Sequence, residues 1–237
     1  MKKNLDCEVL VIGSGAGGST IAETLIDQGL DVLMVEEGPN ANIEKKIEGT
    51  VDSFSYQWRS GGLNAALGDP IISYAEGRCV GGGTEINSAI MQEPPKELIE
   101  SWESKYSIDN FNCKDINNYV EKALKRVNAC YTKPPHGRPS DILKIAGEKL
   151  NWKIKELKRA QKGTIDINPF LSGTKDSGKQ SMSVSLIAES LNKGMNLISN
   201  CRVTKIITKK NKVSHIEAVV SSENKKTSII IKAKYIF

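Results

Sequence analysis

The first 36 residues contain the pattern that most restricts the fold of this chain. An apolar run at 8–12 leads directly into Gly-Ser-Gly-Ala-Gly-Gly at 13–18, which fits the spacing G-x-G-x-x-G. We predict a buried parallel strand, a helix that ends near Asp27, and a second strand over 31–35 that finishes at Glu36. An acid about twenty positions beyond the glycines completes a β-α-β unit of the kind that binds dinucleotides.

Each glycine of this turn has a physical task. Gly13 permits the tight turn, Gly15 lets the backbone approach a pyrophosphate, and Gly18 allows close contact between helix and strand. Glu36 would accept hydrogen bonds from ribose hydroxyls and would repel a 2′-phosphate, which disfavours NADP. The alternative is an ordinary strand–turn–helix whose glycines serve no ligand.

A second glycine-rich stretch runs from Gly77 to Ser88 and includes three consecutive glycines at 81–83. Such a segment lets the backbone touch a flat or phosphorylated ligand, although alone it is also typical of a simple turn. We predict a short buried helix from Thr84 to Ala89. Asn87 would then contact the ligand through its amide or cap a helix by satisfying free backbone donors, and these two roles are compatible.

The composition excludes several classes of function. The net charge of +5 comes largely from eight lysines between 205 and 234, which alternate with β-branched residues and should line solvated strand faces rather than bind nucleic acid. Five cysteines without C-x-x-C spacing and only two histidines argue against a metal site and favour a reducing compartment. No run approaches a transmembrane span and no apolar leader precedes residue 8, so we expect a cytoplasmic protein.

The middle of the chain has helical periodicity. Residues 41–69 look like an irregular connection, and amphipathic helices are predicted over 96–104, 115–128 and 140–150. Ser140 should cap the last of these, with Ile142, Ala146 and Leu150 turned inward.

From residue 183 the pattern changes back to mixed structure. We predict a helix over 183–193, a strand over 195–199, and three strands over 203–208, 213–220 and 227–233 that form an antiparallel meander. Polar turns at 210–211 and 223–224 join them. Residues 235–237 look like the first part of another buried strand.

Two glycine motifs in this order and spacing resemble the N-terminal part of the glucose–methanol–choline (GMC) oxidoreductases, which are FAD-dependent enzymes acting on alcohols. Gly13 to Gly18 with Glu36-Glu37-Gly38 is similar to the ADP-binding segment of that family, and Glu76 to Asn87 is similar to its flavin-contacting signature. Some members bind FAD covalently through a histidine in this signature. Here Ile86 precedes Asn87, so the resemblance implies non-covalent FAD.

The resemblance also implies a domain division and a set of site residues. The expected fold is α/β, with a Rossmann-like FAD-binding parallel sheet in which 197–199 lies beside 32–35, an antiparallel meander and an inserted helical region. Residues 1–92 and 178–237 would form the FAD-binding domain, and 93–177 a helical cap or substrate region. The predicted cofactor-binding residues are Gly13, Ser14, Gly15, Gly17, Gly18, Glu36, Arg78, Gly81, Gly82, Gly83, Thr84, Asn87 and Val203, the last through its backbone near the adenine.

The resemblance covers nearly all of this chain but only about the first half of a family member, which suggests truncation at the C-terminus. The helical block is similar in order and length to the long-chain alcohol oxidase branch. The expected partners are an alcohol and an unidentified electron acceptor. Neither His136 nor His215 matches the family's catalytic base, so no catalytic residue and no metal ligand is assigned.

Two other functions stay open. The chain could bind FAD, or nothing, without catalysing a reaction. It could also be an NAD-dependent dehydrogenase built on the same β-α-β unit, against which the motif from Gly81 to Asn87 argues.

Overall fold

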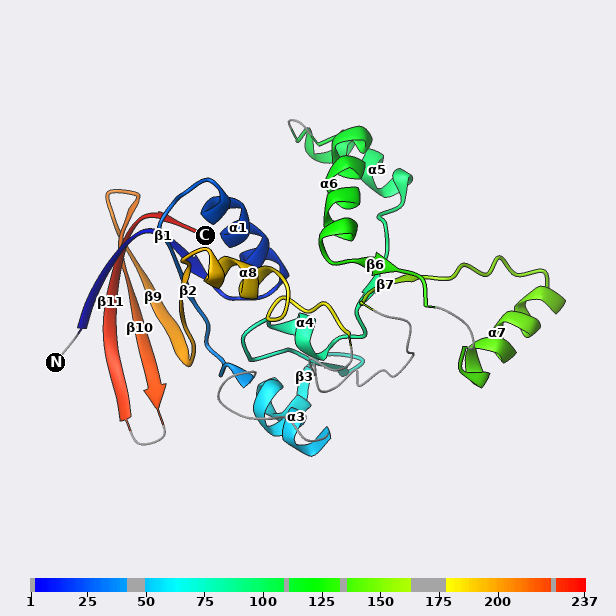
Figure 1. Cartoon of the computed structure of the whole chain (residues 1–237), viewed down its shortest axis with the longest axis horizontal. Coiled ribbons are helices and arrows are strands. Elements are labelled where there is room, and N and C mark those ends of the chain that lie inside the picture. Colours follow the sequence, from blue (N-terminus) through cyan, green and yellow to red (C-terminus); the bar gives the residue numbers. More distant parts are fainter. Residues whose placement is uncertain (1–2, 42–49, 109–110, 133–135, 163–177, 223–224) are drawn as a thin grey trace. The chain divides into compact units, whose positions relative to one another are not determined.

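The computed structural model describes residues 3–41, 50–108, 111–132, 136–162, 178–222 and 225–237 (Figure 1). Their contacts divide them into two units. The first unit takes the described residues up to Asn87 and those from Ser181 onward, and the second takes the described residues between Ser88 and Gln180.

The first unit is built on a six-stranded sheet with the order β8-β2-β1-β11-β10-β9. Strands β8, β2, β1 and β11 are parallel neighbours, whereas β11, β10 and β9 form an antiparallel meander. The predicted α/β fold with a Rossmann-like parallel sheet and a meander is therefore confirmed. The strands are β1 (Lys3–Ile12), β2 (Val32–Val35), β8 (Asn196–Ile198), β9 (Cys201–Lys209), β10 (Lys212–Ser222) and β11 (Lys225–Ile236).

The strand predicted beside β2 is in place, because Leu197 of β8 lies opposite Met34. The separate strand predicted at 235–237 is wrong. Residues up to Ile236 continue β11, which pairs with β10 through Ile231 and with β1 from Ile229 onward. Exposed lysines at 232 and 234 interrupt the apolar pattern there without ending the extended chain. The predicted turn at 223–224 lies outside the described residues.

Apolar strands and two helices form the core of the first unit. Val9, Leu10 and Val11 of β1 and all four residues of β2 are buried, as expected for parallel strands covered on both faces. Helices α1 (Ala16–Asp27) and α8 (Leu186–Asn192) pack against each other (Figure 1). Both are predicted helices, although α8 begins three residues later than expected.

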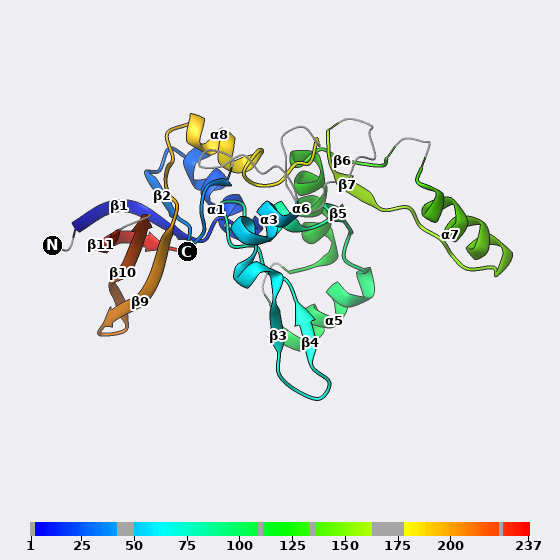
Figure 2. The same cartoon turned by 90° about the horizontal axis from the view of Figure 1, so that it is seen from below.

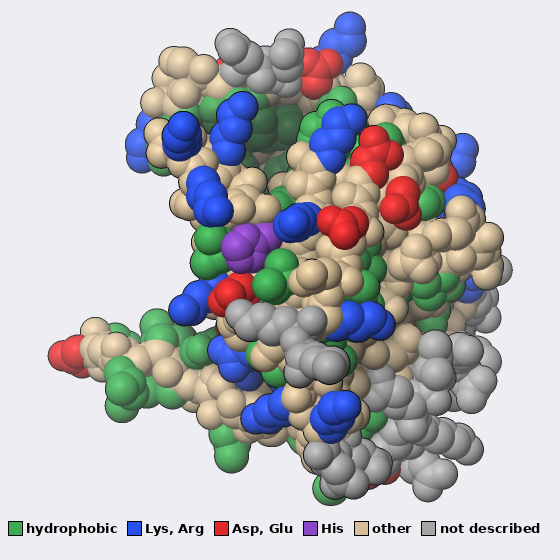
Figure 3. Space-filling model, turned by 90° about the vertical axis from the view of Figure 1, so that its left-hand side faces the viewer, with side chains coloured by type: hydrophobic (Ala, Val, Ile, Leu, Met, Phe, Trp, Pro, Cys, Tyr) green, Lys and Arg blue, Asp and Glu red, His purple; other side chains and the backbone are tan. Residues whose placement is uncertain are grey.

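The meander carries its lysines on the outside, as predicted. All eight lysines between 205 and 234 are exposed, while Ile216, Ala218, Ile229 and Ile231 are buried. Figure 3 shows Lys and Arg side chains spread among acidic, apolar and uncharged groups rather than gathered in one field. This distribution is typical of solvated strand faces.

The segment expected to be irregular, residues 41–69, and the residues directly after it contain regular elements. They are α3 (Thr50–Gln57), the 3-10 helix η1 (Arg59–Gly62) and the hairpin of β3 (Asn64–Ala66) and β4 (Ile72–Tyr74), which Figure 2 shows as a two-stranded arm. The sequence did not indicate α3 because its most buried side chains, Ser53 and Gln57, are polar. Its buried face therefore has no apolar periodicity.

The second unit combines three helices with a small sheet. The helices α5 (Lys96–Tyr106), α6 (Cys113–Arg126) and α7 (Arg138–Lys149) were all predicted. The sheet, in the order β5-β7-β6, was not, because β5 (Ile90–Met91), β6 (Ala129–Cys130) and β7 (Lys158–Ala160) are too short to show an alternating pattern.

Two details predicted for α7 are wrong. Gly137 is the residue that precedes the helix, and Ser140 lies inside its first turn rather than capping it. Ile142 and Leu150 are 55% and 57% exposed instead of inward. The sequence pattern defines an apolar stripe, but tertiary contacts decide whether that stripe is covered, and the described chain leaves these side chains open.

Candidate functional site

The first glycine motif is joined to Glu36 by buried hydrogen bonds. Ser14 donates to Glu36 Oε2 twice, from its hydroxyl at 2.6 Å and from its N–H at 2.9 Å. Gly38 N–H donates to Oε1 at 2.8 Å. Ser14 is fully buried and Glu36 is 7% exposed, so these bonds stabilise a carboxylate that has lost most of its water.

The second glycine motif lies directly on the first. Gly81 N–H donates to Ser14 Oγ at 3.0 Å, and a Cβ added at Gly82 would stand 3.0 Å from Gly15 Cα. Val80 N–H donates to Pro39 C=O at 2.9 Å. The structure therefore brings together the two stretches on which the sequence prediction depends.

Several glycines are required by the protein's own packing. A Cβ at Gly38 would collide with the Arg78 carbonyl, and one at Gly77 with the Gly82 carbonyl. At Gly81, which has a φ of +96°, a Cβ would meet the Glu85 carboxylate. Gly18 has no room beside the Gly13 carbonyl, which confirms its predicted role in helix–strand packing.

Three other glycines have no such requirement. Gly15, Gly17 and Gly83 have no heavy atom within 4 Å of an added Cβ, and none has a positive φ. Alanine would fit the protein at these positions. Open space beside backbone at a helix N-terminus is what a close-lying anionic or planar ligand needs.

Side chains of the second motif also anchor the segment after residue 180. The motif contains the helix α4 (Gly83–Ile86), where Thr84 Oγ1 donates to Gly81 C=O at 2.6 Å and accepts from Met182 N–H at 3.0 Å. Glu85, 1% exposed, accepts from Ser183 N–H at 3.2 Å through Oε1. Sequence reasoning missed Glu85 because its burial depends on residues 98 positions away.

The helix around Asn87 differs from the expected one. It ends at Ile86, and Asn87 N–H donates to Gly83 C=O at 3.0 Å, so Asn87 follows the C-terminus of α4. A role in satisfying free backbone donors at a helix start is therefore wrong. The Asn87 side chain is exposed, and its contact with a ligand stays a prediction.

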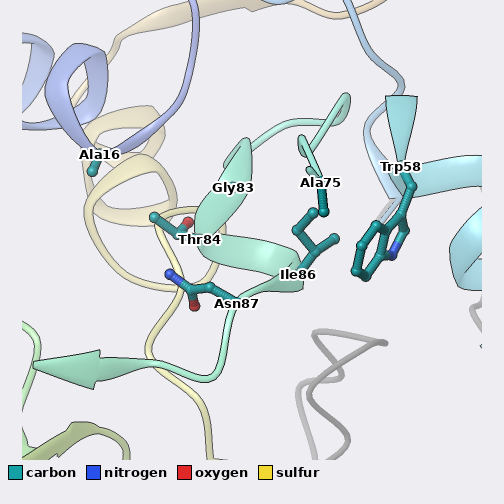
Figure 4. A pocket seen from close by; sticks show the side chains of 7 residues that line it. All are labelled: Ala16, Trp58, Ala75, Gly83, Thr84, Ile86 and Asn87. Carbon is teal, nitrogen blue, oxygen red and sulfur yellow. The ribbon is translucent and has the colours of Figure 1, made fainter. Parts of the chain in front are cut away.

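A cavity of about 470 Å³ opens beside α4 in the first unit. Its lining residues are Ala16, Trp58, Ala75, Gly83, Thr84, Ile86 and Asn87. Figure 4 shows Ile86 directed toward Trp58 and Ala75, whereas Thr84 and Asn87 leave α4 on another side. Trp58 falls in the segment 41–69, which was predicted only to be an irregular connection, and its indole N–H donates to Ser53 Oγ at 3.2 Å.

An ion-pair cluster ties the segment after Glu36 to the second motif. The Glu37 carboxylate accepts from Arg59 Nη1 at 3.0 Å and from Arg78 Nε at 3.1 Å, and Arg59 Nε also pairs with Glu76 at 2.6 Å. Partial burial alone would raise the pKa of Glu37. The hydrogen bonds and charges of Arg59, Arg78 and Arg202 outweigh this effect and hold that pKa below its ordinary 4.5.

Val203 lies two residues after the point where β9 meets the residue that follows β2. Cys201 N–H donates to the Glu36 carbonyl at 2.7 Å, so the start of β9 meets the end of β2. Cys201 and Val203 pair in regular register with Val220 and Ala218 of β10, and backbone groups two residues apart on a strand face the same way. The Val203 backbone therefore faces the side of β9 on which Glu36 lies.

Neither histidine is a member of this cluster. His215 is half-buried in β10, with Nδ1 3.2 Å from Ser214 Oγ, and His136 belongs to the second unit, with Nδ1 3.5 Å from Thr132 Oγ1. Neither lines the cavity beside α4. Among the described helices, none has the length and apolarity needed to cross a membrane.

Comparison with known proteins connects this geometry to one family. Residues 8–237 match the model of the GMC oxidoreductases. An uncharacterised GMC-type oxidoreductase of Sinorhizobium fredii is 43% identical over 214 residues, which are 90% of this chain and 42% of that protein. The long-chain-alcohol oxidase FAO3 of Arabidopsis thaliana is 22% identical over 209 residues, which are 87% of this chain and 28% of that protein.

A solved structure agrees with the fold. Pyridoxine 4-oxidase from Mesorbium loti superposes with a TM-score of 0.67 at 13% identity, over 97% of this chain and 48% of that one. This chain thus spans less than half the length of the relatives it matches.

Proposed function

Because this chain belongs to the GMC oxidoreductase family, we propose that it forms the FAD-binding part of an oxidoreductase that acts on the CH–OH group of an alcohol. The observation that carries the proposal is the set of glycines that the protein itself does not require. Gly15, Gly17 and Gly83 border open space in ordinary backbone conformations, and Gly83 also lines the cavity beside α4. A bound dinucleotide gives these positions a reason to lack side chains.

The nucleotide half of FAD fits the first motif. The start of α1 presents free backbone N–H groups at Gly15 and Gly17, which would hold the pyrophosphate. Glu36 would accept hydrogen bonds from the ribose, since three protein donors leave part of its acceptor capacity free. Val203 would contact the adenine through its backbone, and Gly13 and Gly18 would shape the turn.

The flavin half fits the second motif. Backbone from Gly81 to Thr84 and the side chain of Asn87 would lie against the ring system, and the Arg78 guanidinium would stand near the cofactor while it pairs with Glu37. When bound, FAD supplies the acceptor for the hydride released from the alcohol carbon. The chain's own residues bind and orient it, and we assign no residue of this chain as the catalytic base.

The attachment of FAD is proposed to be non-covalent. Ile86 stands immediately before Asn87, is 8% exposed, and offers no nucleophilic atom for a bond to the flavin. The long-chain alcohol oxidase and pyridoxine oxidase among the relatives support a small-molecule alcohol as substrate, with the electron acceptor unidentified. The division into an FAD-binding domain, residues 1–92 with 178–237, and a cap or substrate region, 93–177, belongs to this proposal.

The experiment is a flavin titration of the purified chain. We expect FAD to bind with quenched flavin fluorescence, and mild denaturation to release all of it as unmodified FAD. Gly83→Ala should weaken FAD binding while preserving the thermal unfolding midpoint, because Gly83 touches no protein atom that a methyl group would strike. A chain that binds NAD and ignores FAD would contradict the proposal.

Catalysis is tested separately by adding alcohols to the FAD complex without oxygen. Bleaching of the flavin absorbance by an alcohol would support the oxidoreductase proposal for this chain. An FAD complex that no alcohol reduces would favour the alternative, an FAD-binding chain without activity of its own.

A further inference from the structure

Ser14 occupies a position that the proposed cofactor contacts do not explain. It is fully buried in the turn between β1 and α1, and both its donors are used within the protein. Its hydroxyl and its N–H converge on one oxygen of Glu36, at 2.6 and 2.9 Å. Ser14 thus has no donor left for a phosphate, although its place in the glycine motif suggests a direct contact.

The same hydroxyl also receives a bond from the second motif. Gly81 N–H donates to Ser14 Oγ at 3.0 Å across 67 positions of the chain. Because the Gly81 N–H can only donate to Ser14 Oγ, the hydroxyl hydrogen is the one that Ser14 donates to Glu36 Oε2. The result is a buried relay from Gly81 through Ser14 to Glu36.

We propose that Ser14 is a positioning residue that couples the nucleotide half of the cofactor site to its flavin half. It holds the Glu36 carboxylate in the orientation that recognises a ribose, and it holds the Gly81 loop against the first motif. This inference rests on the proposed function, in which Glu36 contacts the ribose of FAD and the Gly81 loop contacts the flavin.

The coupling follows from how buried polar groups depend on their partners. Without the Ser14 hydroxyl, Glu36 Oε2 loses its shortest hydrogen bond and the Gly81 N–H loses its acceptor. Each buried group must then find another partner by moving. Both halves of the site are therefore expected to loosen together.

The test is a double-mutant cycle of Ser14→Ala and Glu36→Gln, read by calorimetric titration with ADP and with FAD. ADP reaches only the first motif. We expect Ser14→Ala to weaken ADP binding about tenfold, and to weaken FAD binding by a larger factor because the Gly81 loop is also released. Glu36→Gln should weaken both ligands by the same factor. In the Glu36→Gln background, Ser14→Ala should cost little further ADP affinity.

A purely structural serine would behave differently. Its removal would lower the thermal unfolding midpoint while leaving ADP affinity unchanged, or it would weaken ADP equally in both backgrounds, and either result overturns the inference. Ser190→Ala is the matched control, since Ser190 is 1% exposed and its hydroxyl has no partner among the described residues. It should leave both affinities unchanged.

Two further outcomes are distinguishable. If Ser14→Ala does not fold, the cycle is run with Ser14→Cys, which keeps a weak donor in nearly the same volume and should give a smaller loss of the same pattern. A parent chain that binds neither ADP nor FAD overturns the proposed function together with this inference. A parent that binds both, with additive losses, overturns the role of Ser14 alone.

Discussion

The two glycine motifs look alike in sequence but differ in what their glycines touch. In the first, Gly15 and Gly17 border open space. In the second, Gly77 and Gly81 have no room for a Cβ because Gly82 and Glu85 of the same motif fill the space. Gly15 and Gly17 are therefore left open for what the first motif would bind, whereas Gly77 and Gly81 are required by the folding of the second motif itself. Glycine content alone does not reveal this difference.

Substitutions at the two kinds of glycine should therefore affect different properties, either stability or ligand binding. A methyl group on a packed glycine should disturb folding, and one on an open glycine should disturb only the ligand. Gly83 is the informative exception, because it belongs to the second motif yet faces open space in the manner of Gly15. Gly83 thus stands open between interlocked residues, since Thr84 and Glu85 directly after it accept hydrogen bonds from Met182 and Ser183.

Gly77→Ala should have the largest effect. The new Cβ would overlap the backbone carbonyl of Gly82, and backbone cannot move aside as a flexible side chain does. We expect the free energy of unfolding to fall by at least about 3 kcal/mol, measured by urea denaturation. Unchanged stability would show that the loop repacks easily and would remove the contrast between the motifs.

Gly17→Ala should separate binding from stability. Gly17 lies in α1 with nothing near its Cβ position, so alanine should leave the free energy of unfolding unchanged or raise it by up to about 1 kcal/mol. FAD affinity should nevertheless fall about tenfold or more, because a methyl group enters the space proposed for the pyrophosphate. A fluorescence titration and a thermal melt on one preparation check both parts. A loss of stability would place Gly17 with the packed glycines.

Glu37→Gln should have the smallest effect and tests the polar link between the motifs. The pKa of Glu37 lies below its ordinary 4.5 in the folded chain. Its stabilising contribution is therefore complete above pH 4.5 and is lost as the pH falls through the lower folded value. We expect Glu37→Gln to reduce stability at neutral pH by no more than about 1 kcal/mol, because the pair is partly exposed.

The measurement is the free energy of unfolding as a function of pH for parent and variant. The two curves should converge as the pH drops below 4.5. A constant gap over the whole acid range would mean that the ionised carboxylate is not what joins the motifs.

Much of the fold was predictable because its signals are local. Apolar runs, the glycine spacing and the meander turn at 210–211 each depend on a few neighbouring residues, and the structure has all of them. Short strands such as β5 and β6 were not predictable, since two residues have no periodicity. The buried face of α3 was missed for a related reason, because Ser53 and Gln57 carry its polar contacts.

The errors at α7 and Asn87 have a different origin. At α7 the error concerns which neighbours the helix meets, and at Asn87 it concerns where the helix ends, since α4 stops at Ile86 instead of continuing to Ala89. A local sequence pattern specifies neither. Ile142 has helical spacing and yet remains exposed. Asn87 is a residue type that favours helix starts and yet follows a helix end.

By itself, the sequence determined the β-α-β unit, the acid at its end and the presence of a second glycine motif, because these features require particular residues at short spacings. Only the tertiary structure decided that Ser14 reaches both Glu36 and Gly81, and which glycines pack and which stay open. Those relations join residues 22 and 67 positions apart. They form only when folding brings these distant residues together and buries Glu36, and a local sequence pattern does not predict such contacts.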